Sequence, residues 1–147
     1  MPGTPEKNVG AIARECLGLR VRAVNRVLSS IYDDALRPCG LKISQFTILV
    51  VIANYGTVRP VGIGDFIQMD NSTLSRNLER MRRQNWIEVV EDDTDARAHP
   101  VRLTADGRRI LDCAMPKWEE AQEQARRRLG ETGVRALEVL AETVMKS

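Results

Sequence analysis

Hydroxyl and guanidinium side chains gather in one short stretch of the chain, Asp70–Arg83, with the sequence DNSTLSRNLERMRR. At about 100° per residue, Leu74, Leu78 and Met81 fall on one side of a helix and the arginines on the other. Asp70 suits the N-cap, because its carboxylate can accept hydrogen bonds from the free N–H groups of the first turn. The exposed face would carry the groups that contact phosphates and guanine edges in the major groove of DNA. A solvated basic face on an ordinary amphipathic helix gives the same pattern, so this stretch alone leaves both interpretations open.

The composition is that of a globular protein with little net charge. The 147 residues are 43% hydrophobic, which is enough for one domain with its own core. The chain has 22 Lys and Arg against 20 Asp and Glu, for a formal net charge of +2. This charge permits nucleic-acid binding without indicating it. The distribution of arginines is more informative, since many of them cluster within 14–26, 76–83, 97–109 and 126–128.

Other chemistries have little support in the sequence. Cys16, Cys39 and Cys113 share no short spacing and the chain has one histidine, His99, which argues against a structural zinc site. There is no Gly-rich phosphate loop after a strand and no evident set of nucleophile and base, so we expect no enzyme, no metal and no cofactor. Free thiols, the lack of a signal pattern and the lack of a run of ~18 apolar residues predict a cytoplasmic protein without a membrane partner.

Helical periodicity dominates the chain before the basic stretch. A polar tail at 1–8 is followed by two adjacent apolar stripes over 9–37. One stripe is enough for packing on a small domain, so the second predicts a further covered surface, such as another subunit.

The segment 45–55 allows two interpretations. The run Ile48–Ile52 favours a buried strand by propensity, whereas Ser44 as N-cap and the distance to Gly56 favour a buried helix. A short helix at 61–68, a tight turn and the basic stretch then match the spacing of a helix-turn-helix.

An alternating pattern follows the basic stretch and predicts two short strands at 86–91 and 100–104. A hairpin in this position is a wing, and Arg97 in its polar loop suits the narrow minor groove. The Asp-x-Asp spacing at 92–95 could suggest calcium, but the glycine and terminal glutamate of a calcium loop are missing, which favours a solvated turn. Thr104 as N-cap then begins a long helix that Pro116 should kink or divide, and Gly130–Gly133 separates a last amphipathic helix.

Two motifs in this order resemble the MarR family of bacterial transcription regulators. The segment Asp70–Leu78 is similar to the family variant Asp-Arg-Thr-Thr-Leu-Thr-Arg-Asn-Leu, although Asn71 replaces its arginine. Asp95-x-Arg97 followed by Leu103-Thr104-x-x-Gly107 resembles the wing motif of the family. The resemblance spans roughly residues 12–145 and favours a helix at 45–55. It implies a mainly α fold with a small β-hairpin wing, in which a winged helix-turn-helix lobe at 41–104 lies between dimerisation helices at 9–37 and 105–147.

The resemblance also implies a function and a set of site residues. The protein would be a sequence-specific DNA-binding regulator, a repressor that binds a pseudo-palindromic operator as a homodimer and is released by a small, often phenolic ligand. Asp95 would hold the wing through a salt bridge, for example to an arginine of the recognition helix. The residues that would contact DNA are Ser72, Thr73, Ser75, Arg76, Arg80, Arg97, Lys42 and Gln45. The residues that would line a ligand pocket between the dimer layer and the DNA-binding lobes are Arg22, Tyr32, Ile48 and Trp118.

Two alternatives stay open. The position of Cys16 is similar to that of the reactive cysteine in the peroxide-sensing branch of the family, so a thiol-based oxidant sensor is one alternative. The aromatic and tyrosine partners of that branch are missing here, which favours a small apolar residue in the dimer layer. A helical protein-interaction module without DNA contact is the other alternative, and it explains the two stripes but not the wing motif.

Overall fold

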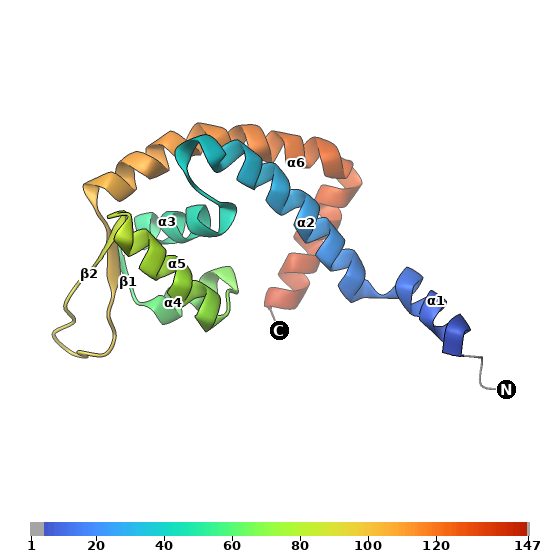
Figure 1. Ribbon diagram of the computed structural model, residues 1–147, viewed down its shortest axis with the longest axis horizontal. Coiled ribbons are helices and arrows are strands. Elements are labelled where there is room, and N and C mark those ends of the chain that lie inside the picture. The colour runs from blue at the N-terminus through green and yellow to red at the C-terminus, as the bar shows by residue number, and fades with distance from the viewer. Residues whose placement is uncertain (1–4, 147) are drawn as a thin grey trace.

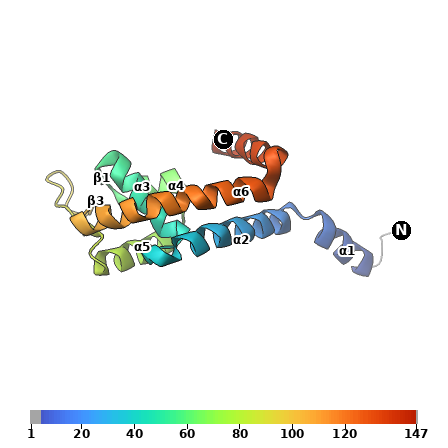
Figure 2. The ribbon, with the colours of Figure 1, turned by 90° about the horizontal axis from the view of Figure 1, so that it is seen from above.

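The protein consists of a helical layer above a small lobe of helices and strands. The computed structural model describes the backbone of residues 5–146 and the side chains of residues 8–146. In Figures 1 and 2, α2 and the long arm of α6 run side by side, and in Figure 1 the lobe that contains α3, α4, α5 and the strands lies beneath them. The mainly α fold with a winged helix-turn-helix is therefore confirmed. The elements are α1 (Pro5–Glu15), α2 (Leu17–Leu36), the 3-10 turn η1 (Arg37–Cys39), α3 (Ile43–Tyr55), β1 (Thr57–Val58), α4 (Pro60–Ile67), α5 (Asn71–Arg83), β2 (Ile87–Val89), β3 (Val101–Leu103) and α6 (Ala105–Met145).

The single N-terminal helix predicted at 9–37 is two helices. The chain breaks at Cys16, whose backbone is extended with φ −62° and ψ 115°. Gly18 lies just beyond the break and lowers helix propensity locally by roughly 1 kcal/mol relative to alanine. Residues 5–8 of the predicted tail belong to α1, whereas residues 1–4 lie outside the described residues.

The ambiguous segment 45–55 is helical and belongs to α3. Its first amide, that of Ile43, donates to Asp33 Oδ1 at 2.8 Å, and the N-cap is Lys42 rather than Ser44. Phe46, Ile48, Leu49, Val51 and Ile52 are all buried in it. A helix that is buried over most of its surface needs apolar residues at every turn, which is why its sequence looks like that of a buried strand. Among the described helices none is long and apolar enough to cross a membrane alone, and α2 with η1 and α3 reach that length and hydropathy only as a pair bent by 73°.

A three-stranded antiparallel sheet forms the base of the wing, in the order β1-β3-β2. In the predicted hairpin, Ile87 pairs with Leu103 and Val89 with Val101. Strand β1 pairs with the other edge of β3, and it was not predicted because two residues are too short to show a period. This third strand connects the end of α3 to the wing.

Helix α6 carries the wing at its N-terminus and returns along α2. Thr104 is its N-cap, as predicted, and its Oγ1 accepts from the amide of Gly107 at 3.0 Å. We predicted that Pro116 would kink or divide the helix, and it does not divide it, because the helix continues through this exposed proline. The break occurs at Gly130, where φ is 68° and ψ is 169°. Glycine adopts this conformation without the steric cost that a side chain would add.

Candidate nucleic-acid interface

Helix α5 is capped as the sequence predicts. Asp70 Oδ2 accepts from the amide of Thr73 at 2.9 Å, and Oδ1 accepts from the hydroxyl of the same residue at 2.6 Å. These hydrogen bonds hold the pKa of Asp70 below its usual range, because they favour the ionised carboxylate. Leu74 and Met81 are buried beneath the helix. The cap and the buried side together fix which residues α5 exposes.

The exposed side of α5 is termed here the front face, which consists of Ser72, Thr73, Ser75, Arg76 and Arg80. Thr73 is half-buried and the others are exposed. Arg76 Nη2 donates to the hydroxyl of Thr73 at 3.3 Å, so the cap also orients the first arginine of the front face. The structure therefore brings together all five residues predicted at the recognition helix.

The later arginines of α5 have a different environment. Arg82 and Arg83 both form ion pairs with Glu79, each at 3.1 Å. In the part of the chain that the structure describes, neither Arg76 nor Arg80 forms an ion pair. The guanidiniums of the front face thus remain available to an external anion, whereas those at the end of the helix are partly neutralised.

The two residues predicted at the start of α3 lie in different environments. Lys42 is exposed and lines a surface hollow of about 460 Å³ together with Arg37 and Arg80. Gln45 is only 5% exposed, and its Oε1 accepts from the amide of Lys42 at 3.0 Å. Its side chain is therefore occupied in capping α3 and is not free to contact DNA.

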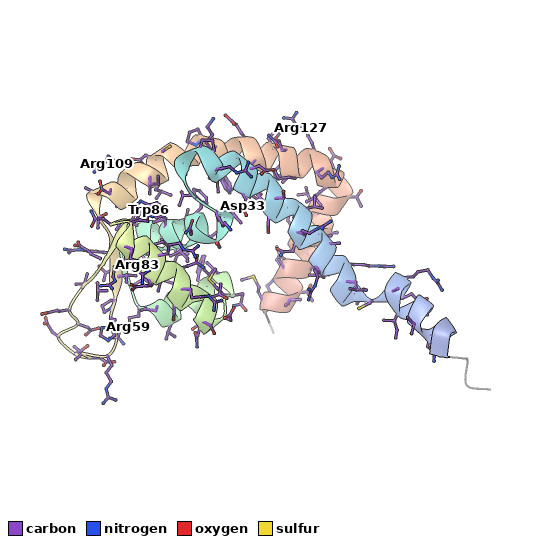
Figure 3. The ribbon with its side chains drawn as sticks, in the orientation of Figure 1. Asp33, Arg59, Arg83, Trp86, Arg109 and Arg127 are labelled. Atoms are coloured by element: carbon purple, nitrogen blue, oxygen red, sulfur yellow. The ribbon has the colours of Figure 1, made fainter. Side chains whose placement is uncertain are left out.

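The wing, residues 87–103, is held by an ion pair that was not predicted. Arg59, the residue before α4, donates through Nη2 to Asp92 Oδ2 at 2.6 Å, and Figure 3 shows Arg59 close to the wing loop. Asp92 Oδ1 accepts from the amide and hydroxyl of Thr94 and from the amide of Asp95. The hydrogen bonds from Thr94, followed by the one from Arg59, hold the pKa of Asp92 far below its usual range.

Asp95 has a local role instead of the salt bridge that we expected. Its Oδ1 accepts from the amide of Arg97 at 3.0 Å, and it forms no ion pair with any described residue. The difference arises because Asp92, at the base of the loop, is within reach of Arg59, whereas Asp95 stabilises the turn near the tip. Arg97 itself is exposed and likewise has no ion pair within residues 8–146.

The interface has two parts on one side of the molecule. In Figure 1, the wing loop extends from the lobe away from α6, and α5 lies beside the wing within the same lobe. The front face of α5 offers hydroxyls and arginines, which suit the major groove. The wing loop offers Arg97, which suits the minor groove. Strand β1 and the Arg59–Asp92 ion pair fix the wing relative to the helix-turn-helix.

The four residues predicted for a ligand pocket do not share one cavity. Ile48 is fully buried in the core. Tyr32 donates to Gln122 and lines a cavity of about 190 Å³. Trp118 lines a different, apolar cavity of about 320 Å³, and Arg22 is exposed on α2.

The three cysteines are free thiols, and they lie in different environments. Cys16 is half-buried at the break between α1 and α2. Cys39 and Cys113, which are far apart in the sequence, have their sulfur atoms 2.7 Å apart. No local spacing could have revealed this pair. Among the described residues, no group of three or more His, Cys, Asp or Glu side chains is placed to hold a metal ion.

Comparison with known proteins finds relatives along most of the chain. A family model described as the MarR family matches residues 40–98. The multiple antibiotic resistance protein MarR of Salmonella typhimurium is 27% identical over 130 residues, which are 88% of this chain and 90% of that protein. The crystal structure of the M. tuberculosis transcriptional regulator MOSR in complex with DNA is 34% identical, with a TM-score of 0.77 over 88% of this chain and 96% of that chain.

A solved structure with lower identity shares the fold. A mutant of MarR from E. coli, complexed with operator DNA, is 24% identical and has a TM-score of 0.80 over 91% of this chain and 96% of that chain. The wing geometry, the capped front face of α5 and these relatives lead to one conclusion. The chain belongs to the MarR family of winged-helix transcriptional regulators.

Proposed function

We propose that the protein is a homodimeric repressor that binds a pseudo-palindromic operator and is released by a small phenolic ligand. The observation that carries the proposal is the front face of α5. The Asp70 cap holds Thr73, Arg76 donates to the hydroxyl of Thr73, and neither Arg76 nor Arg80 forms an ion pair among the described residues. Such a protein works in the compartment that holds the DNA, which is the cytoplasm in bacteria.

The proposed contacts follow from the geometry of the front face. Arg76 is suited to a guanine edge, because a guanidinium can donate two hydrogen bonds to it. Ser72, Thr73 and Ser75 carry hydroxyls that suit phosphates or bases. Arg80 and Lys42 border one hollow, which Arg37 and Asp33 also line; its three cations outnumber the one carboxylate and suit a backbone phosphate. Arg97 would enter the minor groove beside the recognition helix.

Exposed apolar residues support the homodimer. They lie on α1, on α2 and on the last part of α6, where Val21 is 68% exposed and Val144 71% exposed. A second copy packed on these helices through a two-fold interface would remove these side chains from water. The residues of this surface are Val9, Ile12, Leu17, Leu19, Val21, Val24, Leu137, Val139, Leu140, Val144 and Met145.

The apolar cavity beside Trp118 supports an aromatic effector. It has a volume of about 320 Å³ and lies between α3, α4 and α6. Phe46 stacks on Trp118 at its wall, with ring centroids 6.2 Å apart. Pockets of this size and character accept small aromatic molecules. A ligand there would touch both the layer of α6 and the helix-turn-helix, and so could change their relative position.

Footprinting tests the proposal. Purified protein would be incubated with a fragment from the promoter of its own gene and digested with a nuclease. We expect protection of two half-sites whose centres are about 10 base pairs, or ~34 Å, apart. The Arg76→Ala variant should need a higher protein concentration for the same protection. Transcription from the same fragment in vitro should fall when wild-type protein is added. Protection of a single half-site would overturn the homodimer, and increased transcription would overturn repression.

A further inference from the structure

Cys39 and Cys113 form a contact that the DNA-binding function does not use. Cys39 ends the η1 turn, which joins α2 to α3, and Cys113 lies in the third turn of α6. Their Sγ atoms are 2.7 Å apart, so a bond between them requires little movement of either side chain. We propose that this pair is a redox modification site that hydroperoxides convert to an intramolecular disulfide.

The two thiols differ in access, which gives each of them a separate role. Cys113 is exposed, whereas Cys39 is 7% exposed. Burial raises the pKa of Cys39 to about 11, with further increases from the hydrogen bond and the charge of Cys113, against a lowering by Lys117. A buried neutral thiol is a poor nucleophile toward a dissolved oxidant. Cys113 is therefore the sulfur that reacts first, and Cys39 is the resolving sulfur.

The reaction balances with one hydroperoxide. The Cys113 thiolate attacks the terminal oxygen of the hydroperoxide, the O–O bond breaks, and the alcohol leaves with a proton from solvent. Cys113 is now a sulfenic acid. The sulfur of Cys39 attacks the sulfur of this sulfenic acid, the S–O bond breaks, and hydroxide leaves as water with the proton of Cys39. The two sulfurs have lost two electrons, which the hydroperoxide has gained.

The disulfide would join two segments that hold the DNA-binding lobe. Cys39 is three residues before the N-cap of α3, and α6 begins at the end of the wing. A bond between η1 and α6 closes a loop that contains the whole helix-turn-helix and the wing, and it restricts movement of this lobe against α6. In a reducing compartment such a bond is transient, which is the behaviour of a regulatory disulfide. Only this consequence for DNA rests on the proposed function; the oxidation itself does not.

Thiol titration and peptide mapping test the oxidation on the full chain. Wild-type protein would be treated with cumene hydroperoxide, unreacted thiols alkylated, and the digest analysed by mass spectrometry. We expect one of three thiols to remain, a peptide pair joined through Cys39 and Cys113, and full recovery of three thiols after reduction with dithiothreitol. The Tm should rise on oxidation, on the order of 10 °C, because the closed loop is long.

Three variants make the result decisive. Cys16→Ser should oxidise as wild type does and leave no free thiol. Cys113→Ser and Cys39→Ala should show no intramolecular bond and no rise in Tm, and Cys113→Ser keeps the buried residue intact if Cys39→Ala unfolds. The proposal would be overturned by a disulfide that involves Cys16. It would also be overturned if Cys113 became a sulfinic acid without forming a disulfide, or if three thiols remained after treatment. If the bond forms and operator affinity does not change, only the link to DNA binding fails.

Discussion

Asp92 accepts a hydrogen bond from Arg59 at 2.6 Å and so joins the loop of the wing to the start of α4. The same carboxylate closes the turn at Thr94 and Asp95 through its other oxygen. One side chain thus sets both the shape of the loop and its position relative to the helix-turn-helix. Arg97 lies near the tip of this loop, so the contacts of Asp92 also position Arg97.

The first prediction concerns Asp92→Asn. The amide cannot form the ion pair with Arg59 and is a weaker acceptor for Thr94, so the wing should become more mobile. Hydrogen exchange of the amides in residues 92–99 should increase, and affinity for operator DNA should fall several-fold because an exposed ion pair is modest in strength. Asp93→Asn, which removes one neighbouring charge, is the matched control and should leave exchange unchanged. Equal exchange in the two variants would contradict the role of Asp92.

The pH dependence of the wing follows from the same group. The folded pKa of Asp92 is lowered, so its contribution to stability is fully present above the unfolded pKa and is lost only as the pH falls through the folded pKa. Between about pH 5 and 8, exchange in the wing, corrected for the intrinsic rate, should therefore stay constant. Wing opening between pH 8 and 6 would show that another group controls the loop.

A second structural prediction concerns Gly107, the last residue of the wing motif. A Cβ at this position would lie 1.9 Å from the carbonyl oxygen of Trp86. Gly107→Ala should lower the free energy of unfolding by about 1–3 kcal/mol, since the backbone must move to accept the methyl group. Gly62→Ala is the control, because its Cβ would meet only a Val58 side-chain atom at 3.5 Å. Urea unfolding at one protein concentration would measure the free energy of unfolding of both variants. Equal values for the two would contradict the close approach of Gly107 to the Trp86 carbonyl.

The dimer surface can be tested with two exposed valines. Val21 on α2 is 68% exposed and Val61 on α4 is 69% exposed. A charged side chain at either position should therefore have a similarly small effect on the folding stability of the monomer. Val21→Glu should yield monomers in sedimentation velocity experiments, because the carboxylate would be buried in the interface. Val61→Glu should remain a dimer. If Val21→Glu also sediments as the dimer, the interface lies elsewhere.

The apolar cavity beside Trp118 predicts a ligand site. Val50 lines this cavity and is 39% exposed, so Val50→Phe should fill it without unfolding the protein. Calorimetric titration with phenol should show binding to the wild type and at least tenfold weaker binding to Val50→Phe. Val61→Phe, outside the cavity, should bind as the wild type does. Undiminished binding to Val50→Phe would place the effector site elsewhere.

The sequence was informative where local rules determine the structure. The caps by Asp70 and Thr104, the buried side of α5 and the strands of the wing all follow from short-range patterns, and the structure confirms each of them. The helix at α3 required the family resemblance, because a largely buried helix and a buried strand have similar compositions.

The remaining features depend on contacts between distant segments. Asp92 rather than Asp95 forms the ion pair of the wing because β1 brings Arg59 to the base of the loop. Cys39 and Cys113 meet only because α6 packs beside η1. Neither contact can be predicted from residue spacing, because each joins segments that only the fold brings together.

A salt series of Kd values tests whether the front face of α5 binds operator DNA. The measurement compares wild type, Arg76→Ala and Arg83→Ala, whose arginine is already paired with Glu79. We expect wild-type affinity to fall more than about tenfold between roughly 0.05 and 0.2 M salt. Arg76→Ala should cost about 1–3 kcal/mol with relaxed sequence preference, and Arg83→Ala less than about 0.5 kcal/mol. A flat salt dependence, or an Arg76→Ala variant that binds as tightly as the wild type, would contradict the claim.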